Sequence, residues 1–396
     1  MKILILSFYY QPDLCAGSFR ITALVEQLQQ LGGMNCQIEV ISTLPNRYAT
    51  YSVQAPEYEQ QDNLEVHRIR LPNHQSGMFD QIKAFYCFYH NALKLIKHKQ
   101  YDLVVATSSR LFTAFLGARI ARNINAPLYL DIRDIFIDSL KDVLPSAVSK
   151  LVLPVFKQFE RYTFAKAGKV NLVSEGFLDY FLQYYPSLDY EVFTNGIDEE
   201  FIHAQKKTNK TPDGTGDGEV KIILYAGNIG EGQGLHKIVP QLGKQLGNGF
   251  LLKVIGDGGR KQLLVDAISA LGVNNVQLLP PVSRDKLIEY YHQADILFLH
   301  LNDYDAFKKV LPSKVFEYAA FNKPMLAGVS GYAADFIRDN VSNASVFNPC
   351  DVRVAKLSAE ELAFNQVHRS DFISRFRRKN IMQKMAQSII KTAIKL

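Results

Sequence analysis

The sequence predicts an α/β protein built from two doubly wound domains, and two observations lead to this prediction. Short apolar runs typical of buried strands alternate with amphipathic helical stretches along the chain, which favours parallel sheets covered on both faces. With 396 residues, the chain is also long for one domain and comfortable for two. We therefore expect two sheets facing a ligand cleft near the carboxyl ends of their strands.

The composition is that of an ordinary globular protein, with 47% hydrophobic and 21% charged residues. A net charge of +6 and an isoelectric point of about 8.9 suit anionic small molecules or an anionic membrane surface, but are too weak to indicate nucleic acid. The four cysteines lie far apart without metal or redox spacing, so we expect a reducing compartment. No stretch of sequence approaches the ~18 apolar residues of a membrane span.

The first domain is expected over residues 1–200. Residues 2–9 are predicted to form a buried strand and not a signal peptide, and a loop over 10–17 leads into a helix that ends at 32–33. Further strands are expected at 36–42, 64–71, 102–107, 127–131, 169–174 and 190–195. Helices are expected near 79–98, 110–123 and 146–167.

A polar stretch rich in helix breakers, residues 201–218, predicts a linker. The second domain is expected over 219–370. Its strands are predicted at 220–227, 250–255, 276–279, 295–301, 324–329 and 344–347. A C-terminal helix over 371–396 follows, and it could pack back towards the N-terminal domain.

The stretch with the most informative chemistry follows the strand at 295–301. Pro312 and Ser313 are predicted to open a helix, and free N–H groups at a helix start with Lys314 beside them favour a phosphate. Glu317, one turn further on, can accept hydrogen bonds from the vicinal hydroxyls of a ribose. Together these groups offer what a nucleotide diphosphate needs. The alternative is a capped helix whose acidic residue favours the helix dipole.

Two glycine-rich turns, at 227–234 and 256–261, each follow a predicted strand and open a helix. Glycine lets the backbone approach a diphosphate, and the second turn ends in two cations, Arg260 and Lys261. Any turn between a strand and a helix can be glycine-rich. The prediction therefore depends on the convergence of both turns with residues 312–317 at one edge of one sheet.

This conjunction resembles the retaining glycosyltransferases of family 4, which have the GT-B architecture, and the resemblance covers essentially the whole chain. The matching marks are Ala16-Gly17, Thr194-Asn195-Gly196-Ile197-Asp198, Gly227-Asn228-x-Gly230, Gly256-Asp257-Gly258, Ala294-Asp295, Pro312-Ser313-Lys314-x-x-Glu317 and Lys323-Pro324. The sequence is most similar to the branch that builds bacterial O-antigens, capsules and exopolysaccharides, including N-acetyl-L-fucosamine transferases.

The resemblance implies two Rossmann-like domains and the retaining transfer of a sugar, such as an N-acetylated hexosamine or deoxyhexosamine, from a UDP-sugar. The acceptor would be a polyprenyl-diphosphate-linked saccharide, with the enzyme in the cytoplasm and peripheral on the inner face of the membrane. Cations and helix dipoles would stabilise the leaving group without a bound metal, and the sequence has no Asp-x-Asp motif. We expect no cofactor, no metal and no nucleic-acid partner.

The resemblance also implies roles for individual residues. Glu317 would hold the ribose, Ser313 and Lys314 would hold the diphosphate, and the Gly17 loop would close over it from the other domain. The other donor-binding predictions are Gly227, Asn228, Gly230, Gln233, Gly256, Gly258 and Arg260.

Arg133 and Asp134, which follow the strand at 127–131, are predicted to contact the substrates, and Asp134 is a candidate base for the acceptor hydroxyl. The alternative is that Asp134 caps the next helix with Arg133 as its partner. Glu175 matches a family loop and is predicted to contact the acceptor.

Three positions depart from the family pattern. Lys309 stands where the broader family has the first of two glutamates, and Asn228 and Gln233 stand where it has an Arg/Lys pair. We therefore expect that the phosphate-neutralising charge has moved to Lys309 or Lys314, and we count Lys309 among the catalytic candidates. The same departures also leave open the alternative that the protein has only weak catalytic activity.

Two basic segments, 83–99 and 375–395, combine lysines with aromatic or apolar residues and could lie on an anionic membrane. For the second, the alternative is a helix that packs against the core. Two other functions also stay open. One is a UDP-sugar epimerase of the same architecture, against which the pattern at 312–317 argues. The other is a non-catalytic sugar-nucleotide-binding protein, supported only by the departures.

Overall fold

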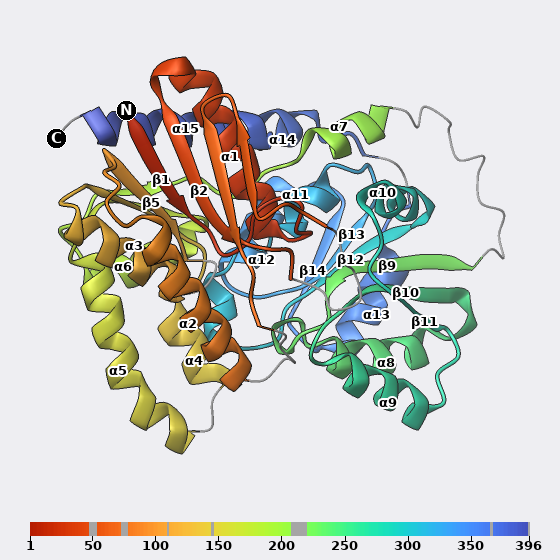
Figure 1. The fold of residues 1–396 in the computed structure, drawn as a ribbon. Coiled ribbons are helices and arrows are strands. Elements are labelled where there is room, and N and C mark those ends of the chain that lie inside the picture. The colour runs from red at the N-terminus through yellow and green to blue at the C-terminus, as the bar shows by residue number, and fades with distance from the viewer. Residues whose placement is uncertain are drawn as a thin grey trace. The chain divides into compact units, whose positions relative to one another are not determined.

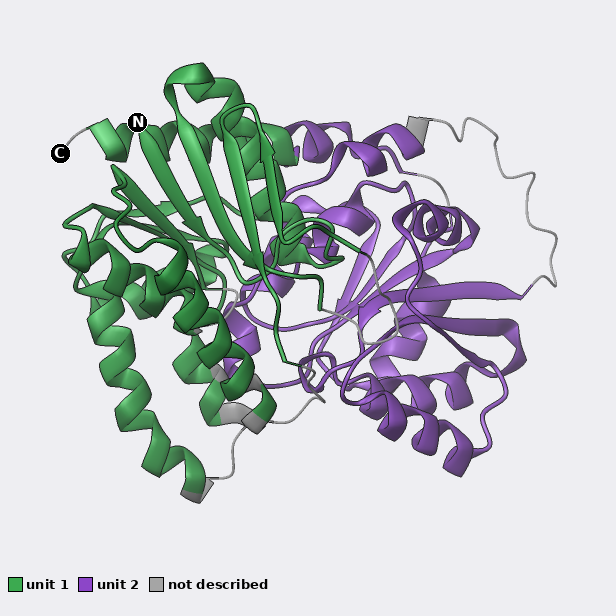
Figure 2. Ribbon diagram, viewed as in Figure 1, with its two compact units in different colours: residues 1–195, 378–396 green, residues 196–377 purple. Residues whose placement is uncertain are grey.

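The computed structural model describes residues 1–46, 54–72, 78–108, 111–143, 146–206, 220–364 and 367–394. The chain divides into two compact units, residues 1–195 with 378–396 and residues 196–377 (Figure 2). The first unit thus ends before residue 200, and the last helix of the chain belongs to it.

The first unit is built on an eight-stranded sheet with the order β3-β4-β2-β1-β5-β6-β7-β8 (Figure 1). All neighbours are parallel except β3 and β4. The strands are β1 (Lys2–Leu6), β2 (Gln37–Thr43), β3 (Tyr58–Gln61), β4 (Leu64–Ile69), β5 (Leu103–Thr107), β6 (Leu128–Ile132), β7 (Ala167–Leu172) and β8 (Tyr190–Val192).

The helices of this unit are α1 (Ala16–Gly32), α2 (Met78–Leu95), α3 (Leu111–Asn123), α4 (Phe136–Val143), α5 (Ser146–Phe164), α6 (Leu178–Tyr184) and α15 (Arg378–Ile394). Strand order reverses at β1, with β2 on one side and β5 on the other. Because crossovers between parallel strands are right-handed, this reversal puts α1 on one face and α2, α3 and α5 on the opposite face. Helix α15 packs along α1.

The second unit has a six-stranded parallel sheet with the order β11-β10-β9-β12-β13-β14. Its strands are β9 (Lys221–Asn228), β10 (Phe250–Asp257), β11 (Val276–Leu279), β12 (Ile296–His300), β13 (Met325–Gly328) and β14 (Ala344–Phe347). Its helices are α7 (Glu199–Lys206), α8 (Leu235–Leu246), α9 (Lys261–Leu271), α10 (Arg284–Gln293), α11 (Lys314–Ala319), α12 (Tyr332–Asn340), α13 (Val352–Glu361) and α14 (Ser370–Arg375). The prediction of two doubly wound α/β domains is confirmed.

A buried ion pair fixes the carboxyl end of the first sheet. Arg20 of α1 is fully buried and donates two hydrogen bonds of 2.9 Å to Asp131 of β6. The same guanidinium also donates to the carbonyl oxygens of Phe193 and Thr194, and Asn171 of β7 donates to Asp131 over 2.7 Å. Because every charge here is met by an opposite charge or a dipole, the desolvation cost of burial is offset.

Three expectations differ from the structure, and two elements are additional to those predicted. Gly17 lies in the first turn of α1 and not in a loop, because that helix begins at Ala16. Residues 201–206 of the predicted linker belong to α7, and its remainder lies outside the described residues. The helix expected over 371–396 is two helices, α14 and α15, in different units. Strand β3 and helix α4 were not predicted.

Gly256 at the end of β10 gives a direct test of the packing in the second unit. Its φ is +152°, and a Cβ there would lie 1.8 Å from the carbonyl oxygen of Gly227 in the neighbouring strand. We expect Gly256→Ala to lower the free energy of unfolding by at least about 2 kcal/mol, measured by denaturant titration. Gly259→Ala is the matched control, because nothing lies within 4 Å of a Cβ there. Equal midpoints for the two variants would contradict this packing.

Candidate active site

The predicted donor-binding residues other than Gly17 all lie in the second unit. They follow the carboxyl ends of β9, β10 and β12, which are adjacent in the sheet. Strand order reverses between β9 and β12, since β10 continues from β9 on one side and β12 returns on the other. Ligands of open α/β sheets bind at such a switch point.

The first glycine turn is held by its own uncharged side chains. Asn228 Nδ2 donates to Gln233 Oε1 over 2.8 Å, and the backbone N–H of Gly230 donates to the same oxygen over 3.2 Å. The hydroxyl of Tyr225 also stabilises the turn, because it donates a hydrogen bond to the Asn228 carbonyl oxygen over 2.7 Å. The two residues that replace the family's Arg/Lys pair therefore bond to each other and shape the turn.

The second glycine turn packs onto the first. The Ile229 N–H donates to the Asp257 carbonyl oxygen, and the Arg260 N–H donates to the Ile229 carbonyl oxygen, each over 2.9 Å. A Cβ on Gly258 would lie 2.6 Å from that same Ile229 oxygen. Glycine at 256 and 258 is thus needed for contact between the two turns, whatever the backbone then binds.

Glu231 neutralises Arg260 at the junction of three loops. Its carboxylate lies 2.6 Å from Arg260 Nε and accepts a hydrogen bond of 2.6 Å from the Tyr304 hydroxyl. Burial opposes ionisation of Glu231, but Tyr304 and Arg260 together hold its pKa below the usual value. Asn302 adds a bond to the Glu231 carbonyl oxygen over 3.1 Å. Arg260 therefore already has a counter-charge.

Lys314 has no such partner. It is the first residue of α11, and it lies so close to Gly227 that a Cβ there would be 2.5 Å from its Nζ. Burial lowers the pKa of this ammonium, and Glu317 opposes the shift. Lys314 Nζ lies over the Tyr225 ring, 5.8 Å from its centroid, but among the described residues no carboxylate lies within 4.0 Å of it, so this ammonium has no ion pair.

Glu317 lies one turn along α11 from Lys314, and its side chain is only 9% exposed. The hydroxyl of Tyr291 donates to its Oε2 over 3.3 Å. The helix itself is seated on β9, because the N–H of Ala226 donates to the Tyr318 hydroxyl over 3.1 Å. Ser313 is the N-cap residue of α11 as predicted, although its side chain makes no capping hydrogen bond. Lys309 ends a 3-10 turn over Asp305–Lys309.

His300, which sequence analysis did not select, ties the first glycine turn to the sheet. Its Nδ1 lies 2.7 Å from the Gln233 carbonyl oxygen, and its Nε2 accepts from the Cys350 N–H over 2.9 Å. Because an acceptor is required at Nε2, the imidazole is neutral with its proton on Nδ1. Burial lowers the pKa of His300 to about 4. Only its position at the end of a predicted strand could have drawn attention to it.

The other predicted residues lie in the first unit. Arg133 follows β6, and its Nη1 is buried without a hydrogen-bond partner among the described residues. Burial lowers the pKa of Arg133, with Asp131 opposing. Asp134 is exposed by surface area, yet desolvation by the surrounding protein raises the pKa of its carboxyl to about 6. The positive charge of Arg133 opposes this shift. Glu175 is exposed at the start of a 3-10 turn over Glu175–Phe177.

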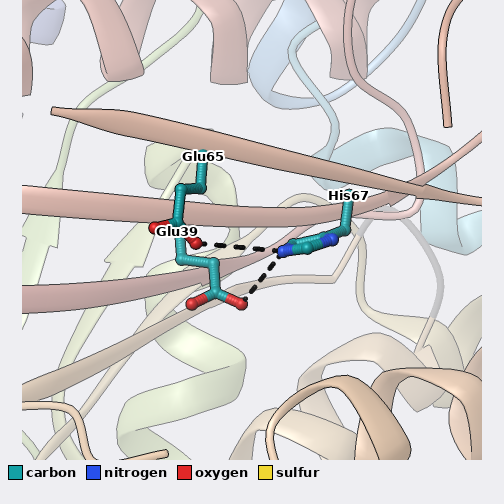
Figure 3. Close-up of side chains that lie close together, drawn as sticks. All are labelled: Glu39, Glu65 and His67. Atoms are coloured by element: carbon teal, nitrogen blue, oxygen red, sulfur yellow. Dashed lines mark ion pairs between the residues drawn. The ribbon is translucent and has the colours of Figure 1, made fainter. Parts of the chain in front are cut away.

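One group of possible metal ligands occurs among the described residues: Glu39, Glu65 and His67, on β2 and β4 (Figure 3). His67 Nε2 lies 3.5 Å from Glu39 and 4.0 Å from Glu65. Glu39 already accepts from Lys99 over 2.7 Å and from the Tyr101 hydroxyl over 2.9 Å. Its charge is therefore met, and the ammonium would repel a cation. The group also lies towards the amino ends of the strands, away from Arg133 and Asp134.

Comparisons with known proteins agree with this geometry. Residues 18–196 match the model of the glycosyl transferase 4-like domain, and residues 206–379 match that of glycosyl transferases group 1. The putative colanic acid biosynthesis glycosyl transferase WcaI of Escherichia coli K12 is 24% identical over 335 residues, which is 80% of each chain.

Solved structures resemble the whole chain. WaaG, a glycosyltransferase involved in lipopolysaccharide biosynthesis, has a TM-score of 0.64 at 15% identity, covering 99% of this chain and 98% of that one. Anabaena Alr3699/HepE in complex with UDP and glucose has a TM-score of 0.65 at 16% identity, covering 98% and 99%. The fold is therefore GT-B. Models of two glycosyltransferase domains match the two halves of the chain, so the protein is a glycosyltransferase of GT-B type.

None of the described helices has the length and apolar content that a membrane crossing requires.

The buried imidazole of His300 predicts a pH dependence of stability. Its folded-state pKa of about 4 lies below the ordinary 6.5, so the unfolded chain binds the proton first as the pH falls. The stabilisation is complete above pH ~6.5 and is lost towards pH ~4, by about 2 kcal/mol between pH 7 and pH 5. Denaturant titrations of His300→Gln at both pH values should show a smaller loss than wild type. Equal losses would contradict a neutral His300.

Proposed function

We propose that the protein transfers an N-acetylated hexosamine or deoxyhexosamine, with retention, from a UDP-sugar to a lipid-linked saccharide of a bacterial surface polysaccharide. The observation on which this depends is the ammonium of Lys314, which has no ion pair and lies one turn from the buried carboxylate of Glu317 at the switch point of the second sheet. A diphosphate would supply the missing negative charge, and a ribose would supply hydroxyl donors to Glu317. The structure of HepE with UDP and glucose supports this choice of donor, and the names of WcaI and WaaG support a surface-polysaccharide acceptor.

In this proposal Lys314 and Lys309 neutralise the β-phosphate as it leaves, in place of a metal ion. The bond from the anomeric carbon to the β-phosphate oxygen breaks, and a bond to the acceptor oxygen forms on the same face of the sugar. The backbone N–H groups of the two glycine turns and of Ser313 would contact the diphosphate. Arg260 has a lesser role than the sequence suggests, since Glu231 already balances its charge.

The first unit would serve the acceptor and the transferred sugar. The orphaned Nη1 of Arg133 offers a hydrogen bond to a substrate oxygen. Asp134, exposed and with a raised pKa, would take the proton of the attacking hydroxyl. Glu175 would bind acceptor hydroxyls, and the first turn of α1 with Gly17 would face the diphosphate. A lipid-linked acceptor places the protein on the inner face of the cytoplasmic membrane.

The alternatives are not favoured. The models that match both halves of the chain are transferase models, which leaves a UDP-sugar epimerase without support. A non-catalytic sugar-nucleotide-binding protein was suggested by the missing Arg/Lys pair. The absence of the Arg/Lys pair has another explanation. Asn228 and Gln233 form a hydrogen bond with each other, and Lys314 supplies a cation nearby.

Lys314→Met tests the donor site, because methionine keeps most of the apolar stem and removes the charge. We expect UDP affinity, measured by isothermal titration calorimetry, to fall by about tenfold or more. Arg260→Met is the matched control and should weaken binding less, because Arg260 is already paired with Glu231. Lys309→Met tests the second candidate cation. If UDP binds wild type but neither lysine variant loses affinity, the assignment of the phosphate charge is wrong.

Asp134 gives the proposal a pH signature. As the base it must be ionised, so we expect turnover to fall as the pH drops below about 6. Asp134→Asn should lower kcat by about 10²–10⁴-fold and leave UDP affinity unchanged. Turnover of Asp134→Asn within a few-fold of wild type would exclude Asp134 as the base.

A further inference from the structure

Helices α2, α3 and α5 form one layer on the first sheet (Figure 1). Their inner sides are joined by phenylalanine rings. Phe85 of α2 contacts Phe112 of α3 at 4.9 Å between ring centroids, and Phe115 of α3 contacts Phe159 of α5 at 4.9 Å. Because α3 contacts both neighbours, the three outer surfaces are presented as one continuous face, here called the α2–α3–α5 face.

The exposed charged side chains of the three helices have one sign. Among the described side chains of the three helices, the exposed charged residues are Lys83, Lys94, Arg119, Arg122, Lys150, Lys157 and Arg161. The acidic residues are Asp80, which is not exposed, and Glu160, which is buried and accepts from the hydroxyls of Tyr180 and Tyr185. The whole chain has 45 basic and 39 acidic residues, so the lack of exposed acids on the described parts of these three helices does not follow from composition.

Exposed apolar side chains lie on the same helices. On α5, Leu151 is 78% exposed, Val155 56% and Val148 41%. Their spacing of three and four residues puts them on one side of the helix, next to the side that carries Lys150 and Lys157. On α2, Ile82 and Tyr86 are exposed four residues apart. Large apolar side chains that stay exposed beside a uniformly basic surface are typical of helices that lie in a membrane interface.

We propose that the α2–α3–α5 face docks on an anionic lipid bilayer, with Leu151 and Val155 entering the interface and the basic residues meeting lipid phosphates. This inference rests on the proposed function, because a lipid-linked acceptor lies in a membrane and the enzyme must bind there to reach it. A second copy of the chain would set basic residues against basic residues. Nucleic acid is a poorer partner, because its bases stack on aromatic or guanidinium planes and the exposed apolar side chains of α5 are aliphatic.

The C-terminal helix α15, the other membrane candidate, is a poorer one. Its apolar side is already used, because Ile381, Met382, Met385 and Ile389 are buried in the first unit. The exposed lysines Lys384 and Lys391 are thus the solvated side of a core helix. This makes α15 a matched control for α5, with the same charge on a helix that has no free apolar stripe.

The test is flotation of the full chain with vesicles of phosphatidylcholine alone or mixed with phosphatidylglycerol. We expect binding to the mixed vesicles only, weakened by high salt. Lys150→Glu/Lys157→Glu should lower the partition coefficient by at least about tenfold, and Leu151→Ser/Val155→Ser should lower it at any salt concentration. Lys384→Glu/Lys391→Glu should leave it unchanged.

Three outcomes would overturn the proposal: no binding to anionic vesicles, equal losses for the α5 and α15 variants, or binding to DNA that competes with the vesicles. Concentration-dependent self-association abolished by Leu151→Ser/Val155→Ser, without vesicle binding, would assign the face to a second copy instead. UDP titration of each variant keeps the two proposals separate. A chain that binds UDP but no vesicles would retain its proposed function and lose only this surface.

Discussion

An ammonium group that is desolvated against backbone and left without a counter-ion is the constraint on which the second unit depends. Lys314 can lie against Gly227 only because that position has no side chain, and Tyr318 holds the same helix to β9. Burial of an ammonium without an ion pair costs free energy that a bound anion would offset. The same helix turn presents the Glu317 carboxylate, so one short element offers a positive and a negative group to a single ligand.

The protein fixes the surroundings of this helix before any ligand binds. The two glycine turns contact each other through backbone hydrogen bonds, and Glu231 joins them to the loop after β12 through Arg260 and Tyr304. The neutral imidazole of His300 adds hydrogen bonds to the backbone of Gln233 and Cys350. In the first unit, the Arg20–Asp131 ion pair holds the carboxyl end of β6 in place, just before Arg133 and Asp134. Rigid edges of this kind lower the entropy lost on binding.

Local pattern was enough to predict most of the fold. Apolar runs such as the one in β12 and the helix start at Ser313 are local signals, and they were placed correctly. Strand β3 was missed because its exposed residues have no apolar alternation. The pairing of Arg20 with Asp131 joins residues 111 apart, and the return of α15 to the first unit is equally non-local. The pairing of Arg260 with Glu231 could not be predicted from sequence, because it depends on side-chain geometry. The basic character of the α2–α3–α5 face could not be predicted either, because it depends on which side chains are exposed.

The most direct test of the central claim is a thermal-shift screen of the purified chain with UDP, GDP, ADP and their common sugar conjugates. A ligand at ~100 times its dissociation constant stabilises the folded state by about 2.7 kcal/mol, which is enough to detect. We expect a shift with UDP or UDP-sugars that Glu317→Ala abolishes. The absence of a shift with every nucleotide, or a shift that Glu317→Ala leaves intact, would contradict it.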